Sequence, residues 1–170
     1  MSHILYLVRH GIAEPTGSAG DASRRLTAEG VRKMRTIAKG LKRLGVVPDV
    51  ILSSPLQRAE ETAAILAAEL LPSKPVDMYD LLAPGHTAEE TAAGLRPYNR
   101  SAGLMLVGHQ PDLGRFAAYL LAGADSLLEL PLRKGGAVAI EIGALPARQP
   151  GSLVWFLTPA QLRLLARKGG

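Results

Sequence analysis

The stretch Tyr6-Leu7-Val8-Arg9-His10-Gly11 decides how the rest of the chain is interpreted. Residues 4–8 are apolar and predict a strand, which ends abruptly in an arginine, a histidine and a glycine. This order places a permanent cation beside an imidazole that is neutral near pH 7. The arginine offers a rigid fork of donors that suits phosphate, and the imidazole beside it is placed to attack a phosphorus atom held there. Gly11 lets the backbone turn sharply or lets a ligand come close.

Strand-like and helix-like segments alternate along the rest of the chain. Further strands are predicted at 50–53, 76–78, 104–107, 137–142 and 153–157. Helices are predicted between them and at the end, beginning after Thr27, Ser54, Thr87, Pro111 and Thr158. This βα alternation, with helices for both faces of the sheet, predicts a three-layer α/β/α sandwich with a mostly parallel sheet. The short link between the last two strands predicts one antiparallel late strand.

The start of the second helix bears directly on the candidate site. Ser54 is predicted to cap this helix, with Pro55 at its first position and Gln57 completing a capping box. Arg58 then lies in the first turn of the helix. There the free backbone N–H groups and the positive end of the helix dipole add to its attraction for anions.

Composition and charge narrow the class of protein. The 170 residues predict one domain spanning 1–170, without cysteine and without the roughly 20 consecutive apolar residues of a membrane span. A cytoplasmic protein with no membrane association is therefore expected. The net charge is +5, and eight of the 20 basic residues lie between Arg24 and Arg43. We interpret this run as a solvated helix face. It contains no aromatic residue, so nucleic acid is not expected as a partner, whereas an acidic protein partner stays open.

Three of the predicted strands are followed by residues that suit phosphate binding. Arg9 and His10 follow the first, Ser53, Ser54 and Arg58 follow the second, and Gly108-His109-Gln110 follows the strand at 104–107. The carboxyl ends of parallel strands meet at one rim of the sheet, which is where ligands bind in α/β folds. The sequence therefore predicts that these residues gather around one anion.

At this point the chain resembles the histidine phosphatase superfamily and, within it, the small SixA-like phosphohistidine phosphatases. Five segments carry the resemblance in family order: Leu7-Val8-Arg9-His10-Gly11, then Asp21 with Arg24, Leu26, Thr27 and Gly30, then Ser53-Ser54-Pro55-Leu56-Gln57-Arg58-Ala59, then Val107-Gly108-His109-Gln110-Pro111, and finally Leu157-Thr158-Pro159-Ala160-Gln161-Leu162. Together they span nearly the whole chain.

The resemblance implies a role for each residue at the rim. His10 would attack phosphorus and become a phosphohistidine intermediate, which water would then discharge. Arg9, Arg58 and His109 would hold the phosphoryl oxygens, and Gly11 would line the same site. Either a cationic or an oriented neutral His109 would serve this purpose. The arginines would occupy the place of a metal ion, so neither a metal nor a cofactor is expected.

One departure from the larger family members concerns the general acid. Phosphoglycerate mutases and acid phosphatases supply a carboxylate that protonates the leaving alkoxide, and the segment Tyr79-Asp80-Leu81-Leu82-Ala83-Pro84-Gly85-His86 has no matching glutamate. Asp80 and His86 are the candidates to replace it. General-acid assistance is worth about 10²–10⁴ in rate, and a phosphoramidate needs it less than an alkyl ester does.

We therefore expect an enzyme, a phosphatase that acts on phosphohistidine in a protein partner. Two alternatives stay open. One is a phosphatase of small phosphorylated substrates, or a phosphoglycerate mutase-like enzyme. The other is a regulatory module that binds a phosphoryl group without turning it over.

Overall fold

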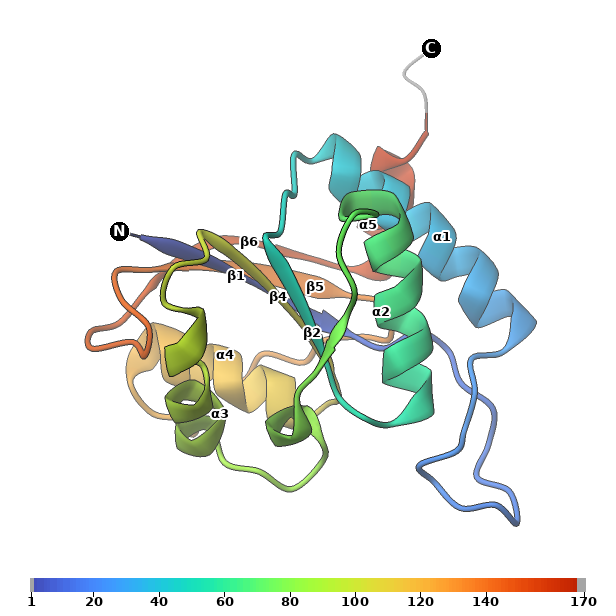
Figure 1. Ribbon diagram of the computed structural model, residues 1–170, viewed down its shortest axis with the longest axis horizontal. Helices are drawn as coiled ribbons and strands as arrows, with labels where there is room; N and C mark the ends of the chain where they lie inside the picture. Colours follow the sequence, from blue (N-terminus) through green and yellow to red (C-terminus); the bar gives the residue numbers. More distant parts are fainter. Residues whose placement is uncertain (1, 168–170) are drawn as a thin grey trace.

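The computed structural model describes residues 2–167, which form a six-stranded sheet with helices on both faces (Figure 1). The strands cross the sheet in the order β3-β2-β4-β1-β5-β6. All neighbours from β3 to β1 are parallel, and β5 runs antiparallel to both β1 and β6. The predicted mostly parallel sheet with one antiparallel late strand is confirmed. The bounds are β1 (His3–Arg9), β2 (Val50–Ser53), β3 (Asp77–Met78), β4 (Gly103–Gly108), β5 (Ala137–Ile142) and β6 (Ser152–Leu157).

The helices divide between the two faces of the sheet, which confirms the three-layer arrangement (Figure 1). One face carries α1 (Ala28–Arg43), α2 (Gln57–Leu70) and α5 (Pro159–Leu165). The opposite face carries α3 (Ala88–Gly94) and α4 (Asp112–Ala122). Two short 3₁₀ turns, η1 (Asp80–Leu82) and η2 (Arg96–Tyr98), flank α3.

Alternation along β1 explains why both faces are covered. Leu5 and Leu7 belong to the apolar cluster under α3 and α4, whereas Tyr6 and Val8 belong to the cluster under α1, α2 and α5. Successive side chains of a strand point to opposite faces, so a strand with apolar residues at every position requires helices on both sides. The strand β4 repeats the pattern with all six of its residues buried.

Most predicted helix signals are confirmed, but the cap predicted for the second helix is wrong. The helix α2 begins at Gln57 with Leu56 as its cap residue, and no side chain caps it. The hydroxyl of Ser54 is instead directed toward His109, with 2.7 Å between Oγ and Nε2. The apparent cap signature therefore belongs to the candidate site. Arg58 still lies in the first turn of α2, as predicted.

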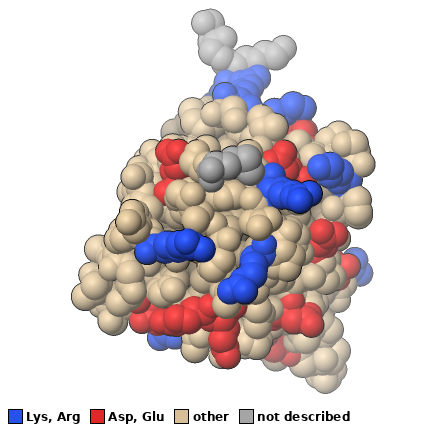
Figure 2. Space-filling view, turned by 60° about the vertical axis from the view of Figure 1, so that its left-hand side comes forward, with Lys and Arg blue, Asp and Glu red and all other residues tan. Residues whose placement is uncertain are grey.

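Positive and negative side chains are mixed on one face of the molecule, the face seen when the left-hand side of Figure 1 is turned toward the viewer (Figure 2). Figure 2 shows acidic side chains along the lower margin of this face and separate basic side chains above them. The excess of positive charge therefore does not form a continuous area in this view. Within residues 2–167, no helix is long and apolar enough to cross a membrane.

The first turn of α1 is fixed against the segment that follows His10. The Ile12 carbonyl accepts a hydrogen bond from the N–H of Thr27 at 2.9 Å, and Thr27 caps α1 by accepting from the N–H of Gly30 at 2.9 Å. A Cβ added at Gly30 would overlap the same Ile12 carbonyl. The contact therefore requires glycine at this position of the helix.

We expect Gly30→Ala to lower the free energy of unfolding by about 1–3 kcal/mol, because the overlap with backbone outweighs the roughly 1 kcal/mol that alanine gains over glycine in a helix. Urea unfolding followed by circular dichroism measures the change. Gly17→Ala is the matched control, since a Cβ at Gly17 meets nothing within 4 Å. Equal stabilities for the two variants would contradict this account.

Candidate active site

The site lies at the rim where β1 and β4 end side by side. The two strands pair in parallel with Arg9 opposite Gly108, and the N–H of His10 donates to the Gly108 carbonyl at 3.0 Å. His109 follows directly, so the His10 and His109 rings lie 5.2 Å apart between centroids. The strand β2 pairs with the other side of β4 and brings Ser54 and α2 to the same rim. The gathering predicted from three strand ends is thus present in the structure.

The hydrogen bonds of His10 fix which of its nitrogens is free to react. Its Nδ1 lies 2.7 Å from the carbonyl oxygen of Gly11, which only accepts, so the proton resides on Nδ1. The lone pair of the ring is therefore on Nε2. Arg58 Nε donates to this lone pair at 3.3 Å, so the arginine and the free nitrogen of His10 are in direct contact.

Burial keeps His10 neutral. Its side chain is buried, and desolvation is the main cause that lowers its pKa to about 4, with the charges of Arg58, Arg9 and Lys134 adding to the effect. The hydrogen bond to Gly11 acts in the opposite direction and is outweighed. A neutral imidazole at pH 7 is the form that has a lone pair to donate.

Asp21, in the loop 14–25, binds the terminal nitrogens of Arg58. The two nitrogens donate to Asp21, one to the carbonyl oxygen at 2.9 Å and one to the carboxylate at 3.1 Å. Arg58 is buried, whereas the Asp21 side chain is 52% exposed. The clamp directs the Nε–H of Arg58 toward His10. Sequence reasoning placed Asp21 only in a family segment, because nothing local links it to an arginine 37 residues away.

The Asp21 carboxylate carries its negative charge at neutral pH. The hydrogen bond from Arg24 is the main cause that lowers its pKa, and the contact with Arg58 contributes further. Arg24 also donates to the Glu14 carbonyl at 2.6 Å, which ties the two ends of the loop together. Asp21 is therefore a fixed anion behind Arg58 and is unsuited to donate a proton.

Arg9 and His109 each have a buried donor atom that no other described residue engages. The Arg9 side chain donates from one terminal nitrogen to the Leu132 carbonyl at 2.9 Å, while its Nε has no hydrogen-bond partner among residues 2–167. The same is true of His109 Nδ1. Buried polar atoms usually have partners, so two such atoms beside His10 indicate an anion site.

Ser54 is the hydrogen-bond partner of the His109 ring. The N–H of Leu56 donates to Ser54 Oγ at 3.3 Å, and the same oxygen lies 2.7 Å from His109 Nε2. A hydroxyl group can donate to Nε2 or accept from it, and we infer that it donates because the Leu56 N–H already uses one of its lone pairs. With Nε2 accepting, the proton of the ring resides on Nδ1. Burial is the main cause that lowers the pKa of His109 to about 3, and the neighbouring His10 and Arg58 lower it further. Of the two forms left open by the sequence, the lowered pKa favours the neutral ring.

The two candidates for a general acid lie apart from these contacts. Asp80 is exposed in η1, and His86 lies in the loop before α3 with its Nδ1 3.6 Å from a Glu90 carboxylate oxygen. The hydrogen bonds recorded for His10, Arg58 and His109 involve neither residue. Their role stays a prediction. No cluster of three or more potential metal-binding side chains occurs within residues 2–167.

Comparison with known proteins agrees with this geometry. A family model described as histidine phosphatase superfamily (branch 1) matches residues 5–83. An uncharacterized protein of Picosynechococcus sp. is 39% identical over 143 residues, which cover 82% of this chain and 86% of that protein. The chain belongs to the histidine phosphatase superfamily, and the resemblance seen in its motifs is confirmed.

Solved structures show the same fold. The protein histidine phosphatase SixA complexed with tungstate matches with a TM-score of 0.82 and 23% identity, over 94% of this chain and 99% of that one. The α-ribazole phosphatase from Shigella flexneri matches with a TM-score of 0.72 and 20% identity, over 92% and 96% of the two chains. At these identities the likeness establishes the fold and leaves the substrate open.

The hydrogen bond from Ser54 generates a test of the His109 tautomer. We expect Ser54→Ala to release the ring, so that protonation of Nε2 and of Nδ1 become comparably populated. Nitrogen-15 NMR of labelled histidine distinguishes the two tautomers. Ser53→Ala is the matched control, because the Ser53 hydroxyl donates to the Ser54 carbonyl and not to His109. An unchanged His109 spectrum in Ser54→Ala would exclude the assignment.

The lowered pKa values of the two histidines predict how stability depends on pH. Both lie below the unfolded value of 6.5, at about 4 for His10 and about 3 for His109. Their contribution is complete above pH 6.5 and is lost as the pH falls, because the unfolded chain then binds protons that the folded chain does not. We expect the free energy of unfolding to fall by about 2 kcal/mol per histidine between pH 7 and pH 5. Urea unfolding at both values measures the loss, and His109→Gln should show a smaller one. Identical losses would contradict this prediction.

Proposed function

We propose that this chain is a metal-independent phosphohydrolase that acts through a phosphohistidine intermediate on His10 and removes phosphoryl groups from phosphohistidine in a protein partner. The observation that carries the proposal is the contact between Arg58 Nε and His10 Nε2 at 3.3 Å, beside the His109 ring at 5.2 Å. A nucleophilic lone pair, a cation and an oriented donor here converge on one point, and membership of the superfamily supports the same chemistry.

The first step of the proposed reaction forms the intermediate. The Nε2 lone pair of His10 attacks phosphorus, and the bond from phosphorus to the substrate imidazole nitrogen breaks with its electron pair on that nitrogen, which takes a proton from water. Arg58 Nε–H loses its acceptor on His10 as that lone pair is used. The same N–H is then free to donate to a phosphoryl oxygen. Arg58 therefore stabilises the negative charge of the phosphoryl group during the transfer.

The second step returns the enzyme to its starting state. Water attacks the phosphorus of phospho-His10, the bond from phosphorus to Nε2 breaks, and inorganic phosphate leaves. In both steps the unengaged donors of Arg9 and His109 hold phosphoryl oxygens. Two guanidinium groups about 4 Å from a phosphoryl charge contribute about 4 kcal/mol each at an effective dielectric constant near 20. The first turn of α2 adds the positive end of its dipole.

The state of Asp21 favours phosphohistidine over alkyl esters. Asp21 is the carboxylate that contacts Arg58, and its lowered pKa leaves it without a proton to give at pH 7. An alkoxide of high pKa leaves poorly without an acid, whereas the imidazole of a phosphoramidate leaves readily. The alternative of a small-ester phosphatase requires Asp80 or His86 to move into reach of the leaving group.

We expect His10→Ala to lose hydrolysis of a phosphohistidine peptide by at least about 10³-fold, because no covalent intermediate forms. Acid-quenched reactions with ³²P-labelled substrate should trap label on wild-type His10 and none on the variant. Asp80→Asn and His86→Ala are the matched controls and should keep the wild-type rate on this substrate. Thermal melting confirms that each variant is folded.

Three outcomes would decide against the proposal. Wild-type hydrolysis by His10→Ala would exclude the nucleophile. A higher kcat/KM for an alkyl phosphate than for phosphohistidine would favour the small-ester phosphatase. Tight phosphate binding with no labelled adduct and no turnover would favour the regulatory module.

A further inference from the structure

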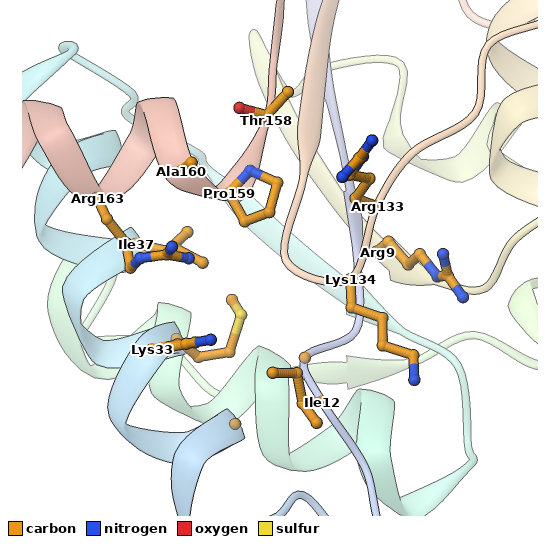
Figure 3. Close-up of a pocket in the computed structure, with 13 residues that line it drawn as sticks. Arg9, Ile12, Lys33, Ile37, Arg133, Lys134, Thr158, Pro159, Ala160 and Arg163 are labelled. Atoms are coloured by element: carbon orange, nitrogen blue, oxygen red, sulfur yellow. The ribbon is translucent and has the colours of Figure 1, made fainter.

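We infer that a basic groove beside His10 binds an acidic segment of the phosphorylated protein partner. The groove is a cavity of about 790 Å³ between α1, α5 and the loop that precedes β5. Its cationic side chains are Arg9 from β1, Lys33 from α1, Arg163 from α5, and Arg133 and Lys134 from the loop (Figure 3). This inference rests on the proposed function and specifies the chemistry of the partner.

The charge of the groove is strongly one-sided. Among residues 2–167, no carboxylate side chain lines it. Lys33 forms an ion pair with Glu29 on the exposed side of α1 at 2.6 Å. Arg133, Lys134 and Arg163 have no ion pair within 4.0 Å in the described part of the chain. Glu29 offsets part of the positive charge at Lys33 and Arg163, and the remaining like charges repel one another, so an anionic ligand would stabilise this arrangement.

The groove adjoins the turn that carries His10, although the side chains of His10, Arg58 and His109 do not line it. Arg9 and Gly11, which flank His10, both line it. The N–H of Gly135 donates to the carbonyls of Arg9 and His10 at 3.1 and 3.2 Å, and this fixes the loop to the turn that carries the nucleophile. Lys134 lies close enough to His10 for its charge to lower the pKa of that ring. A chain attached to a phosphoryl group at His10 therefore meets Lys134 first and the rest of the groove beyond it.

The base of the groove is apolar, which distinguishes a protein segment from a free anion. Ile12, Ile37 and Pro159 lie between the cations (Figure 3), and Met34 also lines the groove. A small polyanion gains nothing from such a surface, whereas a peptide with apolar side chains among Asp and Glu matches both parts of it. None of the described residues that line the groove is aromatic, so these residues offer no stacking surface of the kind typical of single-stranded nucleic acid sites.

The test compares two synthetic phosphohistidine peptides. In one, Asp, Glu and Leu residues flank the phosphohistidine, and in the other Asn and Gln replace the acidic residues. We expect kcat/KM to be roughly tenfold higher for the acidic peptide at low salt, because a few partly exposed ion pairs each contribute modestly. The advantage should shrink toward unity as the salt concentration rises.

The variant that tests the groove is Lys33→Ala/Arg163→Ala, because both side chains come from helices and neither contacts His10. It should lose most of the advantage of the acidic peptide, through a higher KM, and should hydrolyse free phosphohistidine at the wild-type rate. The matched control is Arg35→Ala/Lys39→Ala, which removes one arginine and one lysine from the side of α1 that lies toward α2. This control should keep the preference.

The outcomes separate the inference from the proposed function. Failure to hydrolyse either phosphohistidine peptide would overturn both. Normal hydrolysis with no preference for the acidic peptide, or a preference that the groove variant keeps, would overturn the inference alone. Inorganic tripolyphosphate that competes more strongly than the unphosphorylated acidic peptide would assign the groove to a free polyanion. Self-association that the groove variant abolishes would assign it to a second copy of the chain. Either of these last two results would overturn the inference that the groove binds an acidic segment of the partner.

Discussion

The register between β1 and β4 is the constraint on which the other features depend. Pairing of Arg9 with Gly108 places His10 and His109 directly after adjacent strand ends. A shift of one residue would turn Leu5 and Leu7 to the face covered by α1, α2 and α5, and would separate the two imidazoles along the sheet. The burial of the apolar residues of β1 and β4 on two faces therefore also fixes the geometry of the site. The register between β1 and β4 thus determines both the packing of the core and the position of His10.

The electrostatics of the site follow from burial among cations. The same desolvation that costs stability in acid keeps both rings neutral, and a neutral His10 next to two guanidinium groups has an available lone pair. Asp21 forms an ion pair with Arg58 and so offsets part of its positive charge. Asp21 forms no hydrogen bond with His10 among the described residues. The arrangement attracts a dianion and at the same time leaves the attacking nitrogen unprotonated.

The sequence predicts the strands and helices well because their signals are local. The apolar run before Arg9, the Thr27 cap and the cap boxes at Thr87 and Thr158 depend only on near neighbours, and each is found in the structure. The gathering of His10, Arg58 and His109 also follows from sequence, because parallel strands end at one rim. The roles of these residues are still inferred from family resemblance and chemistry.

The features that could not be predicted from the sequence all depend on contacts between residues far apart in the chain. Ser54 has the local signature of a helix cap, yet its hydroxyl is directed to His109, 55 residues away. Asp21 lies in an exposed loop with no local sign that it clamps Arg58. The basic groove joins α1 to α5 and to the loop before β5, so it does not exist in any single stretch of sequence. Only the folded chain brings these groups together.

The two hydrogen bonds from Gly135 to the turn at His10 have a consequence for substitutions in the neighbouring loop. They are made by backbone atoms alone, so the side chains of Arg133 and Lys134 can change without removing them, whereas Gly135 itself has a φ of +80° and no room for a Cβ. A change of the side chains at these two positions would therefore alter the surface beside the nucleophile and leave the backbone around His10 in place.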